Sequence, residues 1–300
     1  MPPVLIDTDP GVDDALALLQ AWGTPSLAVE AITTVAGNVP VSVATLNVFR
    51  LLGLRDPRPA PAVAEGAAAP LGRPLRTAAH YHGEDGLGDL DDWPPVRPRL
   101  APEGAVDLML AAARRHRGAL TLIALGPMTN VAMALAADPT AMRAIGRVVA
   151  MGGAVDVPGN VTPDAEFNIH VDPEAAARVL DGRLRLDLVP LDATRHAVLP
   201  RAALEAGLAE APGRLAERVR RFTAHSFRRD DARGMTLHDP LAVGLAADPA
   251  LAGWETARIE VGRQGQTRRA EGAPNVRIAR TVDAPRFLEV FLEALCRASS

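Results

Sequence analysis

Short apolar runs alternate with segments of helical periodicity along most of this chain. The apolar runs predict strands at residues 4–6, 28–34, 120–125, 146–151, 186–190 and 256–261. The periodic segments predict helices that begin near Asp13, Val41, Ala105, Met128, Pro173, Pro200 and Asp239. This alternation is typical of βαβ units, whose right-handed crossovers place helices on both faces of a parallel sheet. We therefore expect one α/β domain over residues 1–300, with a largely parallel, Rossmann-like central sheet.

Two stretches interrupt the alternation. Residues 57–102 are rich in Pro, Gly and Ala and contain the sequence HYHGEDGLGD, from His80 to Asp89. A second, polar loop covers residues 155–168. Loops of such length inside a compact domain are usually functional or mobile. Beyond them, residues 284–298 predict an amphipathic helix that closes the chain.

The composition excludes several classes of protein. The net charge is −4 and the arginines are scattered, so we expect no nucleic-acid partner. The chain has no lysine, which excludes Walker-type phosphate loops and enzymes that form a Schiff base on lysine. Cys296 is the single cysteine, which excludes intramolecular disulfides and favours a reducing compartment. Without a signal sequence or an apolar run of membrane length, we expect a cytoplasmic protein with no membrane partner.

The sequence DTDPGVDD, from Asp7 to Asp14, places four aspartates directly after the first predicted strand. Ligands of open α/β sheets bind outside the carboxyl ends of the strands, so the cluster lies where a site is expected. Helix capping accounts for one of these carboxylates but leaves the others unexplained. A divalent cation relieves their mutual repulsion, and oxygen ligands suit Ca²⁺ or Mg²⁺. The cluster therefore predicts a divalent-metal site.

Histidines give weaker indications. Asp239 and Pro240 form an ordinary helix start, but the preceding His238 could donate a proton near neutral pH. His80 and His82 lie two residues apart in the long loop, which is a poor arrangement for zinc without cysteine partners.

Polar side chains also follow other predicted strands. Residues 159–168, GNVTPDAEFN, combine amides with a carboxylate, and this mixture of donors and acceptors suits a hydroxyl-rich ligand. Asx-type turns are the simpler explanation for Asn160 taken alone. Asn38 ends the second predicted strand, where it either closes a turn or faces a ligand. Gly152 and Gly153 allow backbone to approach a ligand closely, although such pairs are common in turns.

Together these motifs resemble the nucleoside hydrolase family, the calcium-dependent, inosine-uridine preferring N-ribohydrolases. The matching segments follow the family's order and extend from residue 5 to about residue 245. They are DTDPGVDD, ITTVAGN at Ile32, HYHGEDGLG at His80, ALGPMTN at Ala124, MGGA at Met151, GNVTPDAEFN at Gly159 and HDP at His238. The resemblance implies hydrolysis of the N-glycosidic bond of a nucleoside to free base and ribose, in nucleoside catabolism or salvage. It also implies a homodimer or a homotetramer.

The resemblance further implies roles for individual residues. One Ca²⁺ would be held by Asp9, Asp14, Asp239 and the backbone carbonyl of Leu125, and Asp9 would also be the base that activates a metal-bound water. The groups implied to bind the ribose hydroxyls are Asp13, Asn38, Asn160, Glu166, Asn168 and the backbone of Met151. His82 and His238 would lie near the base, with His238 as the candidate acid, and Tyr81 could stack on the base. Positive charge near C1′ of an oxocarbenium-like transition state would be stabilised by such carboxylates and amides.

Two segments depart from the family's pattern. The helical stretch 213–233 contributes aromatic groups around the base in relatives, but here it has no tyrosine. Phe222, His225 and Phe227 are the available substitutes, and the preference for purine or pyrimidine stays open. The sequence TRRA at Thr267 replaces an expected Thr-Arg-Gly, and no role is assigned to Arg268 or Arg269.

Two other functions remain open on the residues alone. A metal-dependent nucleoside or ribose sensor would need the same binding groups without catalysis. A haloacid-dehalogenase phosphatase also places DxD after a strand, but such enzymes usually use a lysine that this chain lacks. Release of free ribose distinguishes the hydrolase from the sensor.

Overall fold

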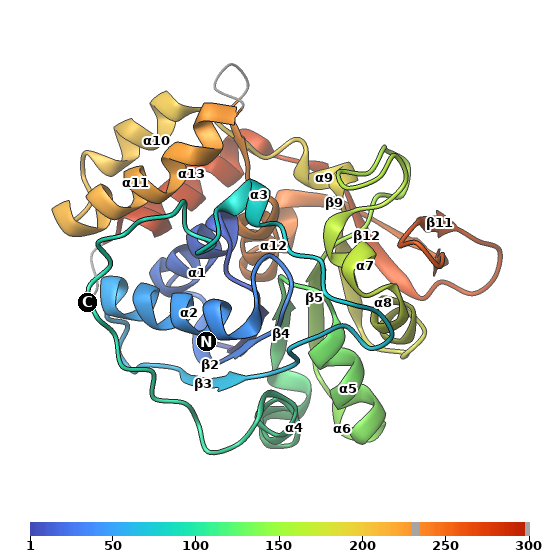
Figure 1. Cartoon of the computed structure of the whole chain (residues 1–300). Helices are drawn as coiled ribbons and strands as arrows, with labels where there is room; N and C mark the ends of the chain where they lie inside the picture. The colour runs from blue at the N-terminus through green and yellow to red at the C-terminus, as the bar shows by residue number, and fades with distance from the viewer. Residues whose placement is uncertain (230–233, 298–300) are drawn as a thin grey trace.

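The computed structural model describes residues 1–229 and 234–297. Its centre is an eight-stranded sheet in the order β3-β2-β1-β4-β5-β6-β12-β9 (Figure 1). In that order the strands are Ala62–Glu65, Ala28–Thr34, Pro3–Thr8, Thr121–Ala124, Arg147–Met151, Leu186–Val189, Val276–Val282 and Ala252–Ala257. β9 pairs antiparallel with β12, and the other neighbours pair parallel. The predicted α/β fold with a largely parallel sheet is confirmed.

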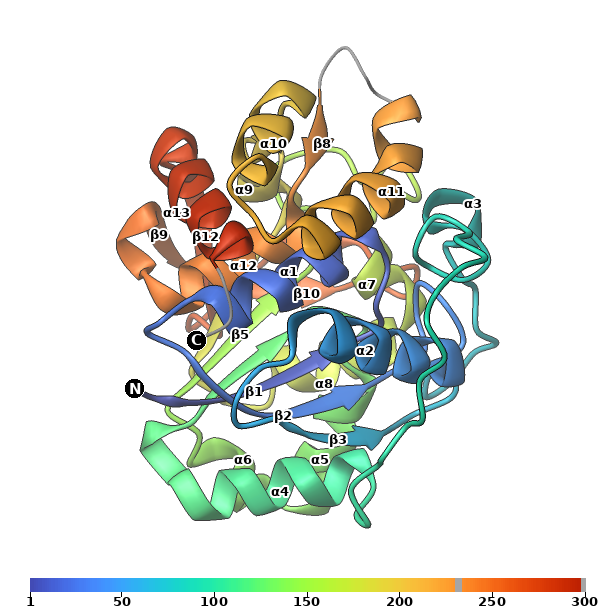
Figure 2. The same ribbon diagram turned by 90° about the vertical axis from the view of Figure 1, so that its left-hand side faces the viewer.

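Helices cover both faces of the sheet (Figure 2). One face carries α1 (Val12–Gly23), α2 (Val41–Arg55), α12 (His238–Ala247) and α13 (Ala284–Cys296). The other carries α4 (Ala105–His116), α5 (Thr129–Ala137), α6 (Pro139–Arg143) and α8 (Pro173–Leu180). Two separate clusters of buried apolar residues fill the space beneath these two layers. Apolar burial of this kind is the main favourable term in folding, so the two clusters hold the helices on the sheet.

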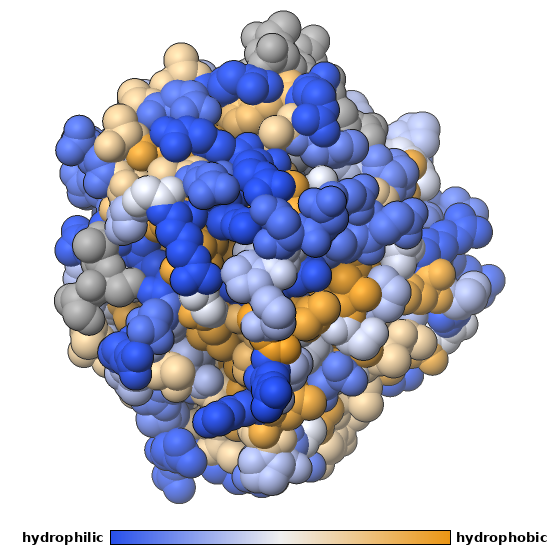
Figure 3. All heavy atoms as spheres, turned by 60° about the vertical axis from the view of Figure 1, so that its left-hand side comes forward, coloured by the Kyte–Doolittle hydropathy of each residue, from blue (hydrophilic) through white to orange (hydrophobic). Residues whose placement is uncertain are grey.

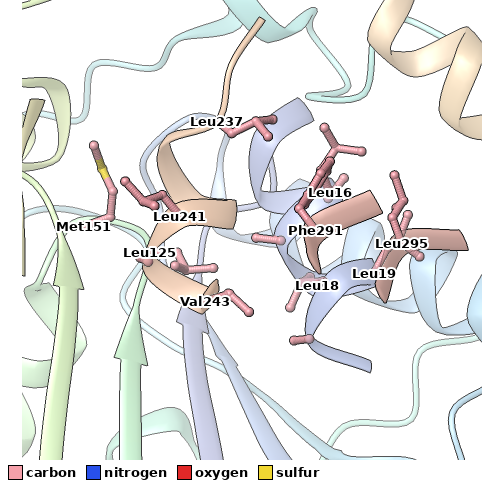
Figure 4. Close-up of a cluster of buried hydrophobic side chains, with 14 of the residues drawn as sticks. Leu16, Leu18, Leu19, Leu125, Met151, Leu237, Leu241, Val243, Phe291 and Leu295 are labelled. Carbon is pink, nitrogen blue, oxygen red and sulfur yellow. The ribbon is translucent and has the colours of Figure 1, made fainter. Parts of the chain in front are cut away.

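The larger apolar cluster also reaches the carboxyl end of the sheet (Figure 4). Leu16 of α1, Leu241 of α12 and Phe291 of α13 are fully buried in it. Leu125 and Met151, which follow β4 and end β5, belong to the same cluster. The core therefore fixes the positions of two segments whose backbone is expected to face a ligand.

Most predicted helices begin within one residue of the expected position, whereas three strands differ from the prediction. β3 lies inside the stretch 57–102, which was expected to be a loop, and β12 was not predicted. The predicted strand 256–261 joins the end of β9 to β10 (Ile259–Val261), which pairs instead with β11 (Thr267–Arg269) in a separate hairpin. The closing helix α13 is confirmed to Cys296, and Ala298 lies outside the described residues.

The remaining elements lie around the carboxyl ends of the strands. They are α3 (Ala79–His82), α7 (Phe167–Val171), α9 (Leu191–Thr194), β7 (Val198–Leu199), α10 (Arg201–Leu208), α11 (Gly213–Arg229) and β8 (Met235–Thr236). Two short 3₁₀ turns complete the list, η1 (Arg117–Ala119) and η2 (Pro249–Leu251). Part of the predicted helical stretch 213–233, residues 230–233, lies outside the described residues.

The surface is mixed in polarity. On the face drawn in Figure 3, hydrophilic side chains cover most of the upper half and hydrophobic ones gather toward the centre and below. Among the described residues, no helix is both long enough and apolar enough to cross a membrane.

Candidate active site

A cavity of about 190 Å³ opens at the carboxyl ends of β1, β4 and β5. It is lined by Asp13, Asn38, Ala78, His80, Tyr81, His82, Leu125, Met151, Asn160, Val161, Glu166, Phe167, Asn168, Met235, Thr236, His238 and Asp239. Open α/β sheets bind ligands at this edge, because loops from several strands converge there. Residues from distant parts of the chain therefore share one pocket of mixed polarity.

Three buried carboxylates meet at the floor of this region. Asp13, Asp14 and Asp239 each offer an oxygen within 4.8 Å of the others, an arrangement that could hold a metal ion. Asp14 is oriented by its neighbours, since its Oδ1 accepts from Thr8 Oγ1 at 2.6 Å and its Oδ2 accepts from Asn38 Nδ2 at 3.0 Å. The aspartates of the first motif and the one in HDP are thus brought together from opposite ends of the sequence.

Asp9 lies beside this cluster and is fully buried. Its Oδ2 accepts from the backbone N–H of Asn38 at 2.6 Å, whereas its Oδ1 has no hydrogen-bond partner among the described residues. A β-carbon added at Gly37 or Gly126 would lie within 2.4 Å of a carboxylate oxygen of Asp9, so glycine is required at both positions. A buried oxygen without a partner is costly, and a bound cation would remove that cost.

Asp9, Asp13 and Asp239 bind protons more readily than ordinary aspartates. Burial, followed by repulsion from Asp14, raises the pKa of Asp9 well above its usual value. The same two causes raise the pKa of Asp13 to about 7. Burial and the neighbouring carboxylates Asp13 and Asp14 raise the pKa of Asp239 as well. A divalent cation among them would favour the charged forms, so the cluster is suited to a cation.

Asp7, the first aspartate of the motif, points elsewhere. Its Oδ1 accepts from Thr33 Oγ1 at 2.6 Å and from Asn130 Nδ2 at 2.8 Å. These bonds tie β1 to β2 and α5 beneath the cavity. Asp7 therefore supports the site from below and does not line it.

Glu166, Asn168 and Asn160 form another part of the cavity lining. Glu166 is 2% exposed, and its carboxylate accepts from the backbone N–H groups of Gly153 (2.9 Å), Asn168 (2.8 Å) and Ile169 (3.1 Å). Asn168 Nδ2 donates to the carbonyl of Leu125 at 2.6 Å and to that of Met151 at 3.3 Å. Asn160 Oδ1 accepts from the N–H of Phe167 at 3.0 Å. Turn chemistry thus explains part of the role of Asn160, while Glu166 and Asn168 present polar groups to the cavity.

His82 and His238 also line the cavity. Nδ1 of His82 accepts from the backbone N–H of Val12 at 3.1 Å, so its remaining ring proton is on Nε2. Nδ1 of His238 lies 2.8 Å from Thr194 Oγ1. Burial, with smaller effects of His82 and Arg195, lowers the pKa of His238 to about 4, so the ring is neutral at neutral pH. Tyr81 packs edge-on against His82, with ring centroids 4.9 Å apart, and is 39% exposed.

The residues expected to replace the missing tyrosine do not line the cavity. Phe222 and Phe227 are buried in the core from α11, and His225 is not among the lining residues either. The amphipathic pattern of α11 places both phenylalanines on its inner face. Their positions in the sequence alone therefore gave the wrong expectation that they would surround the base. Lining side chains that the sequence analysis did not select are Ala78, Val161, Phe167, Met235 and Thr236. Val161 and Phe167 lie within GNVTPDAEFN and the others lie shortly before a recognised motif, but nothing in their residue types distinguished them.

Arg269 braces the loop that carries Asn160. Its guanidinium donates to Asp156 (3.0 Å) and to Glu255 (2.7 Å). Asp156 also pairs with Arg280 at 2.6 Å, and its backbone N–H donates to Asp192. Arg269, left without a role from the sequence, is thus a structural residue outside the cavity.

These features define an α/β enzyme with an acidic, metal-compatible pocket at the carboxyl edge of its sheet. The family model for inosine-uridine preferring nucleoside hydrolases matches residues 4–289. The chain is 36% identical to the pyrimidine-specific ribonucleoside hydrolase RihA of Enterobacter sp., over 99% of this chain and 98% of that protein. It is 37% identical to the non-specific ribonucleoside hydrolase RihC of Klebsiella pneumoniae, over 88% of this chain and 84% of that one. A solved purine-preferring ribonucleoside hydrolase from Gardnerella vaginalis superposes with a TM-score of 0.92 and 28% identity, covering 98% of each chain.

The chain belongs to the inosine-uridine preferring nucleoside hydrolase family. The resemblance stated from the sequence and the enzyme class that it implied, a nucleoside hydrolase, are therefore confirmed.

Proposed function

We propose that this protein hydrolyses ribonucleosides to free base and ribose with the aid of a bound Ca²⁺. The observation that carries the proposal is that carboxylates of the buried cluster and the polar groups of Glu166 and Asn168 line one cavity. A furanose carries several hydroxyl groups and a ring oxygen. Such a ligand needs both acceptors and donors around it, which the cavity supplies.

The residues fit a hard divalent cation. Carboxylate oxygens of Asp14 and Asp239, the unpartnered oxygen of Asp9 and the carbonyl of Leu125 are the ligands we propose. Asp13 lies within the same group of carboxylates, and we assign it to a ribose hydroxyl. Bound there, Ca²⁺ would neutralise the cluster, engage ribose hydroxyls and make a nearby water more acidic.

The remaining chemistry belongs to the side chains. Asp9 takes a proton from the attacking water, since its carboxylate lies beside the proposed metal site. Asn38, Asn160, Glu166, Asn168 and the backbone of Met151 hold the sugar while positive charge develops at C1′, and the carboxylates stabilise that charge. His238 and His82 lie where the departing base would be, and His238 donates a hydrogen bond to it from the N–H of the neutral ring. Tyr81 covers the base from the rim of the cavity.

The residues of the cavity do not favour one class of nucleobase over the other. The relatives named above include a pyrimidine-specific, a non-specific and a purine-preferring enzyme. The base end of the cavity combines Met235 and Phe167 with histidines and Thr236, and none of these excludes a purine by charge. We propose activity on both classes of nucleoside.

The test is release of reducing sugar from inosine, uridine, cytidine and adenosine, each measured with Ca²⁺ and with EDTA. Ribose that appears only with the metal supports the proposal, and the ranking of the four nucleosides gives the base preference. Nucleoside that binds but returns intact in every case would contradict hydrolysis and favour the sensor. The cytoplasmic location and the homodimer or homotetramer expected from the sequence remain predictions.

A further inference from the structure

The hairpin formed by β10 and β11 lies against the segment that carries Glu166, on the right of the molecule in Figure 1. Gln266, which lies between β10 and β11, forms a β-bridge with Ala165, the residue directly before Glu166. The carbonyl of Gln264 lies 2.9 Å from Nδ1 of His170, one turn of helix later. The hairpin therefore contacts the chain on both sides of Glu166.

Through Thr267, the same hairpin also contacts Ala154, which lies shortly after the end of β5. This threonine is 2% exposed and begins β11. Its hydroxyl accepts from the backbone N–H of Ala154 at 2.8 Å and donates to the carbonyl of Ala154, also at 2.8 Å. One side chain thus satisfies both polar groups of a buried residue, as a neighbouring strand would.

Ala154 follows Gly153, whose N–H donates to Oε2 of Glu166 at 2.9 Å. Gly153 has a φ of 92°, in the left-handed region that favours glycine. Because glycine has no side chain, the residue itself does little to fix the direction of the peptide. The direction of that N–H depends on the neighbouring peptides being held. Thr267 holds the peptide groups of Ala154 on one side, and Leu191 donates to the carbonyl of Gly153 at 2.8 Å on the other.

We propose that Thr267 is a positioning residue for Glu166, acting through Ala154 and Gly153 to orient the carboxylate toward the sugar. The inference rests on the proposed role of Glu166 in binding ribose. It gives a purpose to the first residue of the TRRA segment, which the assigned chemistry leaves unused. A hydroxyl is required because the position must donate and accept at once, which valine of the same shape cannot do.

The test is a double-mutant cycle between Thr267→Val and Glu166→Gln, read as kcat/KM for uridine and inosine. Thr267→Val alone should lower kcat/KM roughly tenfold, mainly through KM, because the sugar contact it weakens is made before the transition state. In the Glu166→Gln background the same change should lower kcat/KM by less than about twofold. Thr267→Ser, which keeps the hydroxyl, should stay close to wild type.

A matched control distinguishes positioning from general loss of stability. Thr121 is also a buried threonine, and it begins β4 at the edge of the sheet away from the cavity. Thr121→Val should leave KM unchanged. Should Thr267→Val fail to accumulate as folded protein, Thr267→Cys keeps a similar volume with a weaker donor and enters the same cycle.

Two outcomes would overturn the inference. One is a Thr267→Val enzyme with wild-type kinetics, and the other is an equal loss of kcat/KM in both backgrounds. The affinity for uridine measured by calorimetry provides a reading that does not need turnover. A wild-type protein that releases no ribose would contradict the proposed function, while the effect of Thr267→Val on uridine affinity would still decide the role of Thr267.

Discussion

Asp9 lies beside the clustered carboxylates and has a buried oxygen, Oδ1, without a hydrogen-bond partner among the described residues. We expect Asp9→Ala to lower kcat by roughly a thousandfold, since it removes the general base, and to weaken Ca²⁺ binding. Initial rates of ribose release and calorimetric titration with Ca²⁺ measure the two effects separately. Asp107→Ala, on the exposed side of α4, is the control and should leave both unchanged. Full activity in Asp9→Ala would exclude the proposed base.

His238 poses a different question, because its ring is neutral at neutral pH. A neutral imidazole can still donate a hydrogen bond from its ring N–H to a departing base, and removing it should matter only when the leaving group needs that hydrogen bond. We expect His238→Ala to lower kcat for uridine by about a hundredfold. For p-nitrophenyl riboside, whose leaving group departs without protonation, the loss should be below about threefold. Equal losses on the two substrates would assign His238 to positioning.

At the scale of elements, the segment from His80 to Asp89 is anchored at several points. Leu87 is fully buried, the N–H of Gly88 donates to the carbonyl of His82 at 2.8 Å, and Asn47 Nδ2 donates to the carbonyl of Asp85 at 2.7 Å. These contacts fix Tyr81 and His82 at the edge of the cavity. The segment can therefore position base-binding groups and, if its anchors release, close over a ligand.

We expect Leu87→Ala to cost about 2–4 kcal/mol of stability and to raise KM more than it lowers kcat, because His82 would lose its support. Hydrogen exchange should become faster within residues 76–92 of this variant. Leu100→Ala, an exposed leucine of the same connecting stretch, is the control. In the wild type, a bound nucleoside analogue should slow exchange in residues 76–92 and 213–229. Unchanged exchange there would contradict the idea of a lid.

Strong patterns made most of the elements predictable, and weak patterns explain the exceptions. β1 is a short apolar run followed by a turn and a helix, so both the type of this element and the residue at which it ends could be predicted. β12, VRIARTV, alternates arginine with apolar residues near the edge of the sheet, and its arginines pair with Asp187 and Asp192. Such a charged strand lacks the continuous apolar run of a central parallel strand. β3 is four residues long within a Pro- and Ala-rich stretch, which is too short for periodicity to reveal.

The site was predictable where the chemistry is concentrated in the sequence. The carboxylates of DTDPGVDD and HDP are such a case, and the structure brings them together. Groups that act through shape or through one hydrogen bond were not predictable. Thr194 beside His238 and Thr267 beside Ala154 are ordinary threonines in sequence, and only long-range packing gives them partners. Phe222 and Phe227 are the opposite case. Their sequence positions favoured a place around the base, but both side chains are buried in the core.

At the scale of the whole molecule, the buried carboxylates make stability depend on both pH and metal. Burial raises the pKa of Asp7 and of Asp13 to about 7, well above the value of 3.8 for an exposed aspartate. Because the folded-state pKa is the higher one, the folded protein holds these protons more tightly than the unfolded chain does. The stability they contribute is complete below the unfolded value and is lost as pH rises through the folded value. Asp138 and Asp156, whose pKa values are lowered by hydrogen bonds and arginines, affect stability only at more acidic pH.

We therefore expect the melting temperature in EDTA to fall between about pH 4 and about pH 7, as the carboxylates ionise against one another. Saturating Ca²⁺ should flatten this dependence, because a cation that binds only the folded state adds stability and favours the charged carboxylates. The difference between the two melting curves should accordingly widen as pH rises. Differential scanning calorimetry at several pH values measures it, with Asp9→Asn as the variant in which the difference shrinks. A calcium effect of the same size at every pH would show that the ion binds away from these carboxylates, and the proposed metal site would have to be abandoned.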